Sequence, residues 1–123
     1  MSATITDVGT VAVEVRDQDR ALEFFTAKLD FEARMDVPTP DGGRWVTVAP
    51  SGAAVAVALL ARPNDAARDT GIRFLATDVA REHATMAERG VDVDDVLAWP
   101  GVPPMFSFRD PDGNTFYVVE SAP

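Results

Sequence analysis

The chain has 123 residues, enough for one domain with a substantial core, and 46% of them are hydrophobic while 25% are charged. Its formal net charge of −9 argues against binding to nucleic acid, because an acidic surface repels phosphates. The same charge fits either simple solubility or the attraction of cationic small molecules. The lack of cysteine excludes disulfides, thiolate metal sites and a thiol nucleophile.

No apolar run reaches the roughly 20 residues of a membrane span. The first four residues contain neither a basic region nor an apolar block, so no signal peptide is evident. We therefore expect a cytoplasmic protein with no membrane partner.

The first half of the chain predicts one helix among four strands. Val11, Val13 and Val15 alternate with other residues, as in a strand with one buried face. Asp17 is a candidate N-cap for the helix that follows. The predicted elements are a strand over 10–15, a helix over 18–29, and strands over 32–37, 44–49 and 54–60.

The second half repeats this order after a polar segment, 62–70, that reads as a linker. Asp78 can cap a helix, and Gly90 can end it. The predicted elements are a strand over 71–76, a helix over 79–89, and strands over 91–98, 105–109 and 115–120. We expect an α+β domain of two βαβββ modules, about 5–61 and 70–121, with a mixed sheet in each and the helices on one side.

Residues 108–117 predict a hairpin near the end of the chain. Pro111 presets φ for the first corner of a turn, and Gly113 accepts the positive φ that such a turn needs. Asp110 and Asn114 can bond local backbone groups. Apolar residues on both sides fit two paired strands.

Two acidic runs, 92–95 and 110–112, have spacings similar to those of metal-binding carboxylates. They lack the Gly and Glu positions of a calcium loop, so we expect solvated turn residues at both places. Arg109 lies beside the second run, and we expect it to pair with Asp110 or Asp112.

These motifs, in their order and spacing, resemble the vicinal oxygen chelate superfamily, also called the glyoxalase/bleomycin resistance/dioxygenase superfamily. Phe25 and Asp30 depart mildly from it, because Tyr and Gly are common there. The resemblance implies two modules that form a curved mixed sheet with a central cleft. The residues that carry it are Val13-x-Val15-x-Asp17, Ala21-x-x-Phe24-Phe25, Leu29-x-Phe31, Phe74-x-x-x-Asp78, Gly90-Val91 and Asp110-Pro111-Asp112-Gly113-Asn114.

Enzymes of this superfamily hold a metal in the cleft with His and Glu side chains, and the metal chelates two neighbouring oxygens of the substrate. The matching positions of this chain fall on Thr10, Ile72 and Tyr117, and no His, Asp or Glu occurs between positions 44 and 62. The lone histidine, His83, lies in a predicted helix and is expected to pack there. We expect no metal and no cofactor.

The resemblance also implies which strand faces line the cleft. Alternation predicts that Thr10 and Glu14 face it, and the same logic applied to the second half predicts Ile72, Phe74 and Tyr117. Trp45 and Trp99 could add aromatic walls. The predicted ligand-binding residues are thus Thr10, Glu14, Trp45, Ile72, Phe74, Trp99 and Tyr117.

Each of these residues also has an ordinary structural interpretation. Ile72 and Phe74 fit the packing of the core equally well. Tyr117 fits either a hydrogen bond to a ligand or a buried core tyrosine. Glu14 fits a general base, a group that binds a cation, or an exposed strand end, so Glu14 and Tyr117 are the catalytic candidates.

These features favour a small-molecule binding protein without a catalytic metal. The bleomycin-type resistance proteins, which sequester a drug in clefts of a homodimer, are the functional analogues that the resemblance implies. An apolar cleft and a negative field would suit a cationic aromatic ligand. The alternatives are a lyase, isomerase or dioxygenase-like enzyme acting on a small oxygenated substrate, and a structural or regulatory protein with a vestigial cleft.

Overall fold

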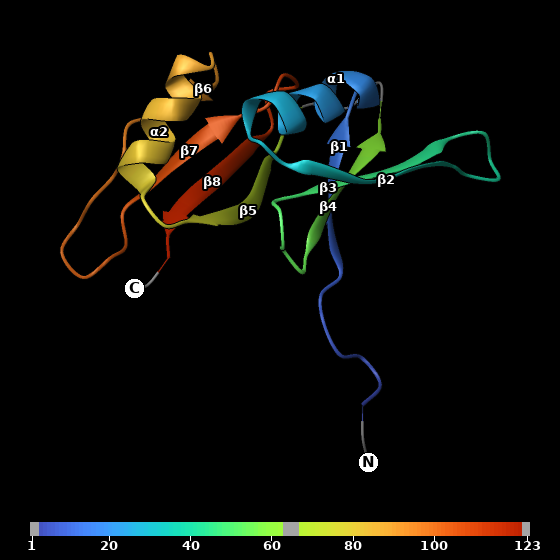
Figure 1. Cartoon of the computed structure of the whole chain (residues 1–123), viewed down its shortest axis with the longest axis horizontal. Helices are drawn as coiled ribbons and strands as arrows, with labels where there is room; N and C mark the ends of the chain where they lie inside the picture. Colours follow the sequence, from blue (N-terminus) through green and yellow to red (C-terminus); the bar gives the residue numbers. More distant parts are fainter. Residues whose placement is uncertain (1–2, 63–66, 122–123) are drawn as a thin grey trace. The chain divides into compact units, whose positions relative to one another are not determined.

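The computed structural model describes residues 3–62 and 67–121, which fold into two compact units (Figure 1). The units cover 1–65 and 66–123, and each has its own four-stranded sheet. Both follow the order βαβββ, which confirms the predicted α+β class. Within the predicted linker, residues 63–66 lie outside the described part of the chain.

The first unit forms a mixed sheet with one helical segment. Its strands lie in the order β1-β4-β3-β2, with β1 parallel to β4 and the other neighbours antiparallel. Val13 and Val15 are buried, as their alternation predicts. The elements are β1 (Thr10–Val15), α1 (Gln18–Glu23), the π-helical turn η1 (Phe24–Lys28), β2 (Glu32–Pro38), β3 (Arg44–Ala49) and β4 (Ala56–Ala61).

The predicted helix over 18–29 forms, but its second half changes type. Asp17 caps it as predicted, because its Oδ1 accepts a hydrogen bond from the Arg20 N–H at 3.1 Å. From Phe24 onward the turns widen to the π form. Phe24 and Phe25 are both buried there, and their rings meet edge to face with 5.3 Å between centroids.

The second unit repeats the arrangement. Its strands lie in the order β5-β8-β7-β6, with β5 parallel to β8 and the other neighbours antiparallel. No helix in the described parts of the two units is long and apolar enough to cross a membrane. The elements are β5 (Asp69–Ala76), α2 (Val79–Glu88), β6 (Asp92–Val93), β7 (Met105–Arg109) and β8 (Thr115–Glu120).

The two faces of the second sheet differ sharply. Along β7 and β8, Phe106, Phe108, Phe116 and Val118 are buried, and the residues between them are partly exposed. Helix α2 packs on the phenylalanine side, where the His83 ring meets Phe106 edge-on at 5.0 Å. We call this side the helix face and the opposite side, which carries Tyr117, the Tyr117 face.

The strand predicted over 91–98 is shorter than expected. Only Asp92 and Val93 form β6, and an isolated bridge joins Leu97 to Met105. Asp94 between them uses its carboxylate to bind Ser107 and a neighbouring arginine side chain. Aspartate is a poor strand former, and beyond β6 the backbone ladder is reduced to one hydrogen bond from the Asp94 N–H to the Ser107 carbonyl, at 2.9 Å, and the Leu97–Met105 bridge.

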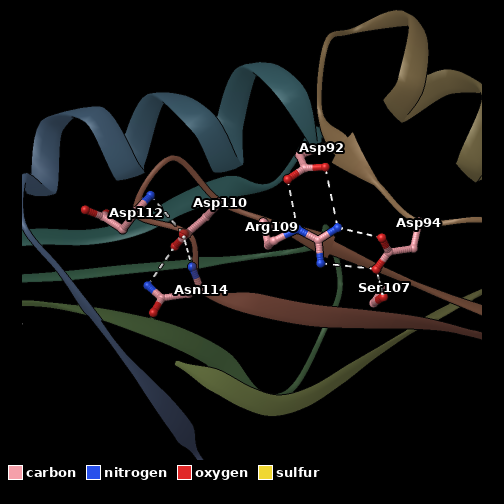
Figure 2. Close-up of polar contacts among 7 residues, drawn as sticks. All are labelled: Asp92, Asp94, Ser107, Arg109, Asp110, Asp112 and Asn114. Atoms are coloured by element: carbon pink, nitrogen blue, oxygen red, sulfur yellow. Dashed lines mark hydrogen bonds and ion pairs between the residues drawn. The ribbon is translucent and has the colours of Figure 1, made fainter. Parts of the chain in front are cut away.

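The turn at the end of β7 is a buried polar network, so the expectation of solvated carboxylates there is wrong. Asp110, Asp112 and Asn114 are at most 8% exposed. Asp110 Oδ1 accepts from the N–H groups of Asp112 and Asn114 at 3.0 and 2.8 Å, and Oδ2 accepts from Asn114 Nδ2 at 3.0 Å (Figure 2). Asn114 Oδ1 accepts from the Arg68 N–H at 3.1 Å, which ties the turn to the start of the unit. Burial raises the pKa of Asp110 above its ordinary value.

Replacing Asn114 with Asp should destabilise the protein in a pH-dependent way. The variant keeps the acceptor for Arg68 but places a second carboxylate 3.0 Å from Asp110. We expect a loss of about 2–3 kcal/mol in the free energy of unfolding at pH 7. Two adjacent carboxylates raise each other's folded-state pKa, so the loss should shrink as the pH falls through that raised pKa.

Urea unfolding between pH 7 and pH 4 measures this effect. The control is Asn114→Ala, which removes the same amide without adding a charge. Loss of the Asn114 hydrogen bond also raises the pKa of Asp110, so this variant should recover part of its stability in acid, but less than Asn114→Asp does. Parallel pH profiles for the two variants would contradict the proposed contact between carboxylates.

Candidate functional site

Tyr117, on β8, lies in a bonded cluster on the Tyr117 face. Its hydroxyl donates to Asp69 Oδ2 at 2.6 Å, and the Arg73 guanidinium lies over its ring, 4.5 Å from the centroid. The hydrogen bond to Asp69 raises the pKa of Tyr117. The same bond, together with one from the Gly71 N–H, lowers the pKa of Asp69. At neutral pH the pair therefore consists of a neutral phenol and an ionised carboxylate.

A bulge in β5 brings Asp69 and Arg73 to the same phenol. Asp69 pairs with Thr115, whereas Arg73 pairs with Tyr117, so four steps along β5 match two along β8. Gly71 sits inside this irregularity with a φ of +68°, and its N–H donates to Asp69 Oδ1 at 3.0 Å. Bulges commonly re-aim side chains beside functional sites, and this one places a carboxylate at the phenol hydroxyl and a guanidinium over the ring.

A second polar cluster lies on the same face, around Arg109 of β7. Its guanidinium binds Asp92 at 2.8 Å and Asp94 at 2.7 Å, and Ser107 donates to Asp94 (Figure 2). The arginine and the serine lower the pKa of Asp94, so this carboxylate stays ionised at neutral pH.

The predicted pairing of Arg109 with Asp110 or Asp112 is wrong. Arg109 points to the Tyr117 face, whereas both aspartates are buried within their own turn. Sequence neighbours along a strand alternate between faces, so adjacency in the chain is a poor guide to pairing.

Thr10, Glu14 and Trp45 share one face of the first sheet. Strand pairing sets Thr10 and Glu14 of β1 beside Ala56 and Leu60 of β4, and the β3–β4 register places Trp45 on the same side. Glu14 is not an isolated carboxylate, because Arg62 Nε lies 3.0 Å from its Oε2. We call this side the Glu14 face.

Phe74 and Ile72 do not share a face with Tyr117, contrary to the sequence prediction. Phe74 pairs with Val118 rather than Tyr117 and stacks on the core rings of Phe108 and Phe116. Ile72 alternates with exposed neighbours in the same way as Phe74 and takes the same side. The prediction took Ile72, six residues before Asp78, as the match of Thr10, which lies seven residues before Asp17, and an error of one residue reverses the face.

Trp99 lies in a tight turn rather than in a strand. The Val102 N–H donates to the Trp99 carbonyl at 3.1 Å, and Gly101 takes a φ of +79°. The indole is 57% exposed. The loop is held at its base by two hydrogen bonds between Leu97 and Met105, at 2.8 and 3.1 Å.

The donor groups on these faces differ from the His and Glu set that the resemblance associates with a metal. Thr10 and Tyr117 offer hydroxyls, and the phenol is already bound to Asp69. Within residues 3–62 and 67–121, no three or more His, Cys, Asp or Glu side chains group in a way that could hold a metal ion. The described residues therefore do not fit that metal site.

Comparison with known proteins gives consistent results. A model of the Glyoxalase/Bleomycin resistance protein/Dioxygenase superfamily matches residues 7–118. Among curated proteins, the uncharacterized protein YetH of Bacillus subtilis is 30% identical over 122 residues, covering 94% of this chain and 99% of YetH.

Two solved structures are similar over nearly the whole chain. TnmS3, an antibiotic binding protein from Streptomyces sp. CB03234, is 31% identical with a TM-score of 0.87, covering 98% of this chain and 100% of TnmS3. A superfamily member from Sphaerobacter thermophilus is 33% identical with a TM-score of 0.90, covering 97% and 100% of the two chains.

Asp69 and Arg73 are the residues that sequence reasoning missed. Asp69 lies in the segment interpreted as a linker, and neither residue belongs to a recognisable motif. The available signal was Gly71, since a glycine at the start of a strand often marks a bulge. Only the pairing with β8 shows that the bulge brings both side chains to Tyr117.

The chain has a single tyrosine, so absorbance of the phenolate reports on Tyr117 alone. We expect the phenol to ionise above its ordinary pKa of 10.0, because the bond to Asp69 favours the protonated form. Asp69→Asn should lower the pKa measured by titration at about 295 nm. Asp92→Asn removes the same charge from the same face without a bond to Tyr117 and should change the pKa much less. Equal shifts in the two variants would contradict the role of the hydrogen bond.

Proposed function

The chain belongs to the glyoxalase/bleomycin resistance protein/dioxygenase superfamily, and from this premise we propose that it is a metal-independent binding protein for a small organic molecule of the antibiotic type. The observation that carries the proposal is the bonded Tyr117–Asp69 pair, at a position where the resemblance implies a metal ligand. A neutral phenol offers a directed hydrogen bond to an organic molecule and is a poor ligand for a hard cation.

Similarity to TnmS3 supports the same proposal. That protein binds an antibiotic and matches this chain from end to end at 31% identity. Of the predicted ligand-binding residues, we propose Thr10, Glu14 and Trp45 on the Glu14 face of the first unit and, in the second unit taken by itself, Tyr117 and the exposed Trp99. We do not assign Ile72 or Phe74 to the site, because Phe74 packs among core rings and Ile72 takes the same side.

An enzyme that uses Glu14 or Tyr117 as acid or base has less support. A raised pKa makes Tyr117 a hydrogen-bond donor rather than a base at neutral pH. Glu14 is paired with Arg62.

We also propose a homodimer, which a mass of about twice 13.2 kDa in sedimentation would support.

Chelator-treated protein should bind no divalent metal tightly and should still bind organic ligands. We expect calorimetric titration with nickel, manganese, zinc and ferrous iron to give no saturable binding at one ion per chain. In a thermal-shift screen of antibiotics, a ligand at 100 times its Kd should add about 2.7 kcal/mol to the free energy of unfolding. That gain should be the same with and without chelator.

Two results would overturn the proposal. Tight binding of one metal per chain would favour the enzyme interpretation. Turnover that is lost in Glu14→Gln would identify Glu14 as the catalytic base of such an enzyme. A screen in which no compound raises the melting temperature would favour a protein without a ligand.

A further inference from the structure

The Tyr117 face is ordered in three rows that run across the strands of the second unit. Residues paired between neighbouring strands point to the same side of a sheet, so the pairing register defines each row. The apolar row is Leu75, Val119, Met105 and Leu97. The middle row is Arg73, Tyr117, Ser107 and Asp94. The charged row is Asp69, Thr115, Arg109 and Asp92.

The apolar row lies at one end of the face and is accessible. Leu75 is 73% exposed and Leu97 is 45% exposed, although both are large aliphatic side chains. The exposed Trp99 lies two residues beyond Leu97, in the turn held by the Leu97–Met105 bridge. Exposed apolar groups gathered in this way are typical of a binding surface.

The other two rows carry three carboxylates and two guanidinium groups, a net charge of −1 on these side chains. Both arginines have partners: Arg109 binds Asp92 and Asp94, and Arg73 lies over the Tyr117 ring. Each ionised carboxylate has several lone-pair positions and can accept from a ligand while keeping its present partner. An anionic ligand would instead have to compete with those carboxylates for the guanidinium groups.

Polarity therefore rises in one direction along the strands, from Leu75 through Tyr117 to Asp69. Neighbouring rows are two residues apart on β8 and β7, about 6.6 Å, so the three rows span roughly 13 Å. This length suits an elongated aromatic molecule with a polar group at one end. The chain's net charge of −9 favours a positive sign for that group.

We propose that the Tyr117 face binds an elongated aromatic cation lengthwise along β5 and β8, with its apolar body on Leu75 and Val119 and its cationic end toward Asp69. This inference rests on the proposed small-molecule function and adds the ligand class and its orientation. The cationic end lies beside the ionised Asp69 carboxylate and the phenol, and the aromatic body covers the β5–β8 part of the apolar row.

Three matched probes test the ligand class. 4-Phenylbenzylamine, 4-phenylbenzyl alcohol and biphenyl-4-carboxylate share one aromatic body and carry a cationic, neutral or anionic group at one end near pH 7.5. We expect the amine to bind the full-length protein roughly 10-fold or more tightly than the alcohol, because a hydrogen bond to a charged group is stronger. The carboxylate should bind most weakly. Calorimetry gives all three dissociation constants.

The variant Leu75→Asp tests the orientation. It adds a carboxylate at the apolar end, and we expect it to weaken binding of the amine by about 5-fold or more, because the aromatic body loses its contact. If the ammonium instead lay near Leu75, the same variant would strengthen binding. The matched control is Ala80→Asp, which adds the same charge at an exposed position of α2 and should leave affinity nearly unchanged.

The outcomes separate this inference from the proposed function. Equal or tighter binding of the carboxylate, or a gain in affinity for the amine in Leu75→Asp, overturns the ligand class or its orientation. If the probes fail to bind while other organic compounds raise the melting temperature, small-molecule binding stands and this inference falls. If no compound binds at all, both fall.

Discussion

The pairing register of β8, an inner strand of the second sheet, determines what each face of that sheet can do. Its alternate residues Phe116 and Val118 enter the core, so Tyr117 between them must point to the other side. The neighbours of β8 follow the same phase, which places Phe108 with the core and Arg109 with Tyr117. The packing of α2 on the helix face and the polar clusters on the Tyr117 face therefore both follow from the register of β8.

The bulge in β5 modifies this register at a single place. A regular strand would continue the phase from Arg73 back to Gly71, which has no side chain to offer. The two additional residues allow Asp69 to reach the phenol from the same edge strand. The acid, the phenol and the guanidinium form one unit whose parts lie close in space but come from both ends of the second module.

Much of the fold could be predicted from the sequence, because local signals were strong. Asp17 and Asp78 cap their helices, and the alternating valines of β1 are buried. Predictions that depended on tertiary pairing were less successful. Phe74 was placed on the wrong face because the spacing of its strand from Asp78 was taken one residue too short. Asp110 was expected in solvent because its burial depends on how the folded turn packs. The role of each proposed ligand-binding residue remains a prediction.

The short strand β6 has a consequence for the protein at high concentration. An exposed sheet edge is a template on which another chain can add a strand, and proteins limit this by keeping edges short and charged. β6 has two residues, and aspartates occupy positions 92, 94 and 95. A strand from another molecule would meet few free backbone groups there and a row of negative charge. This edge therefore disfavours self-association through β6 as the concentration of the protein rises.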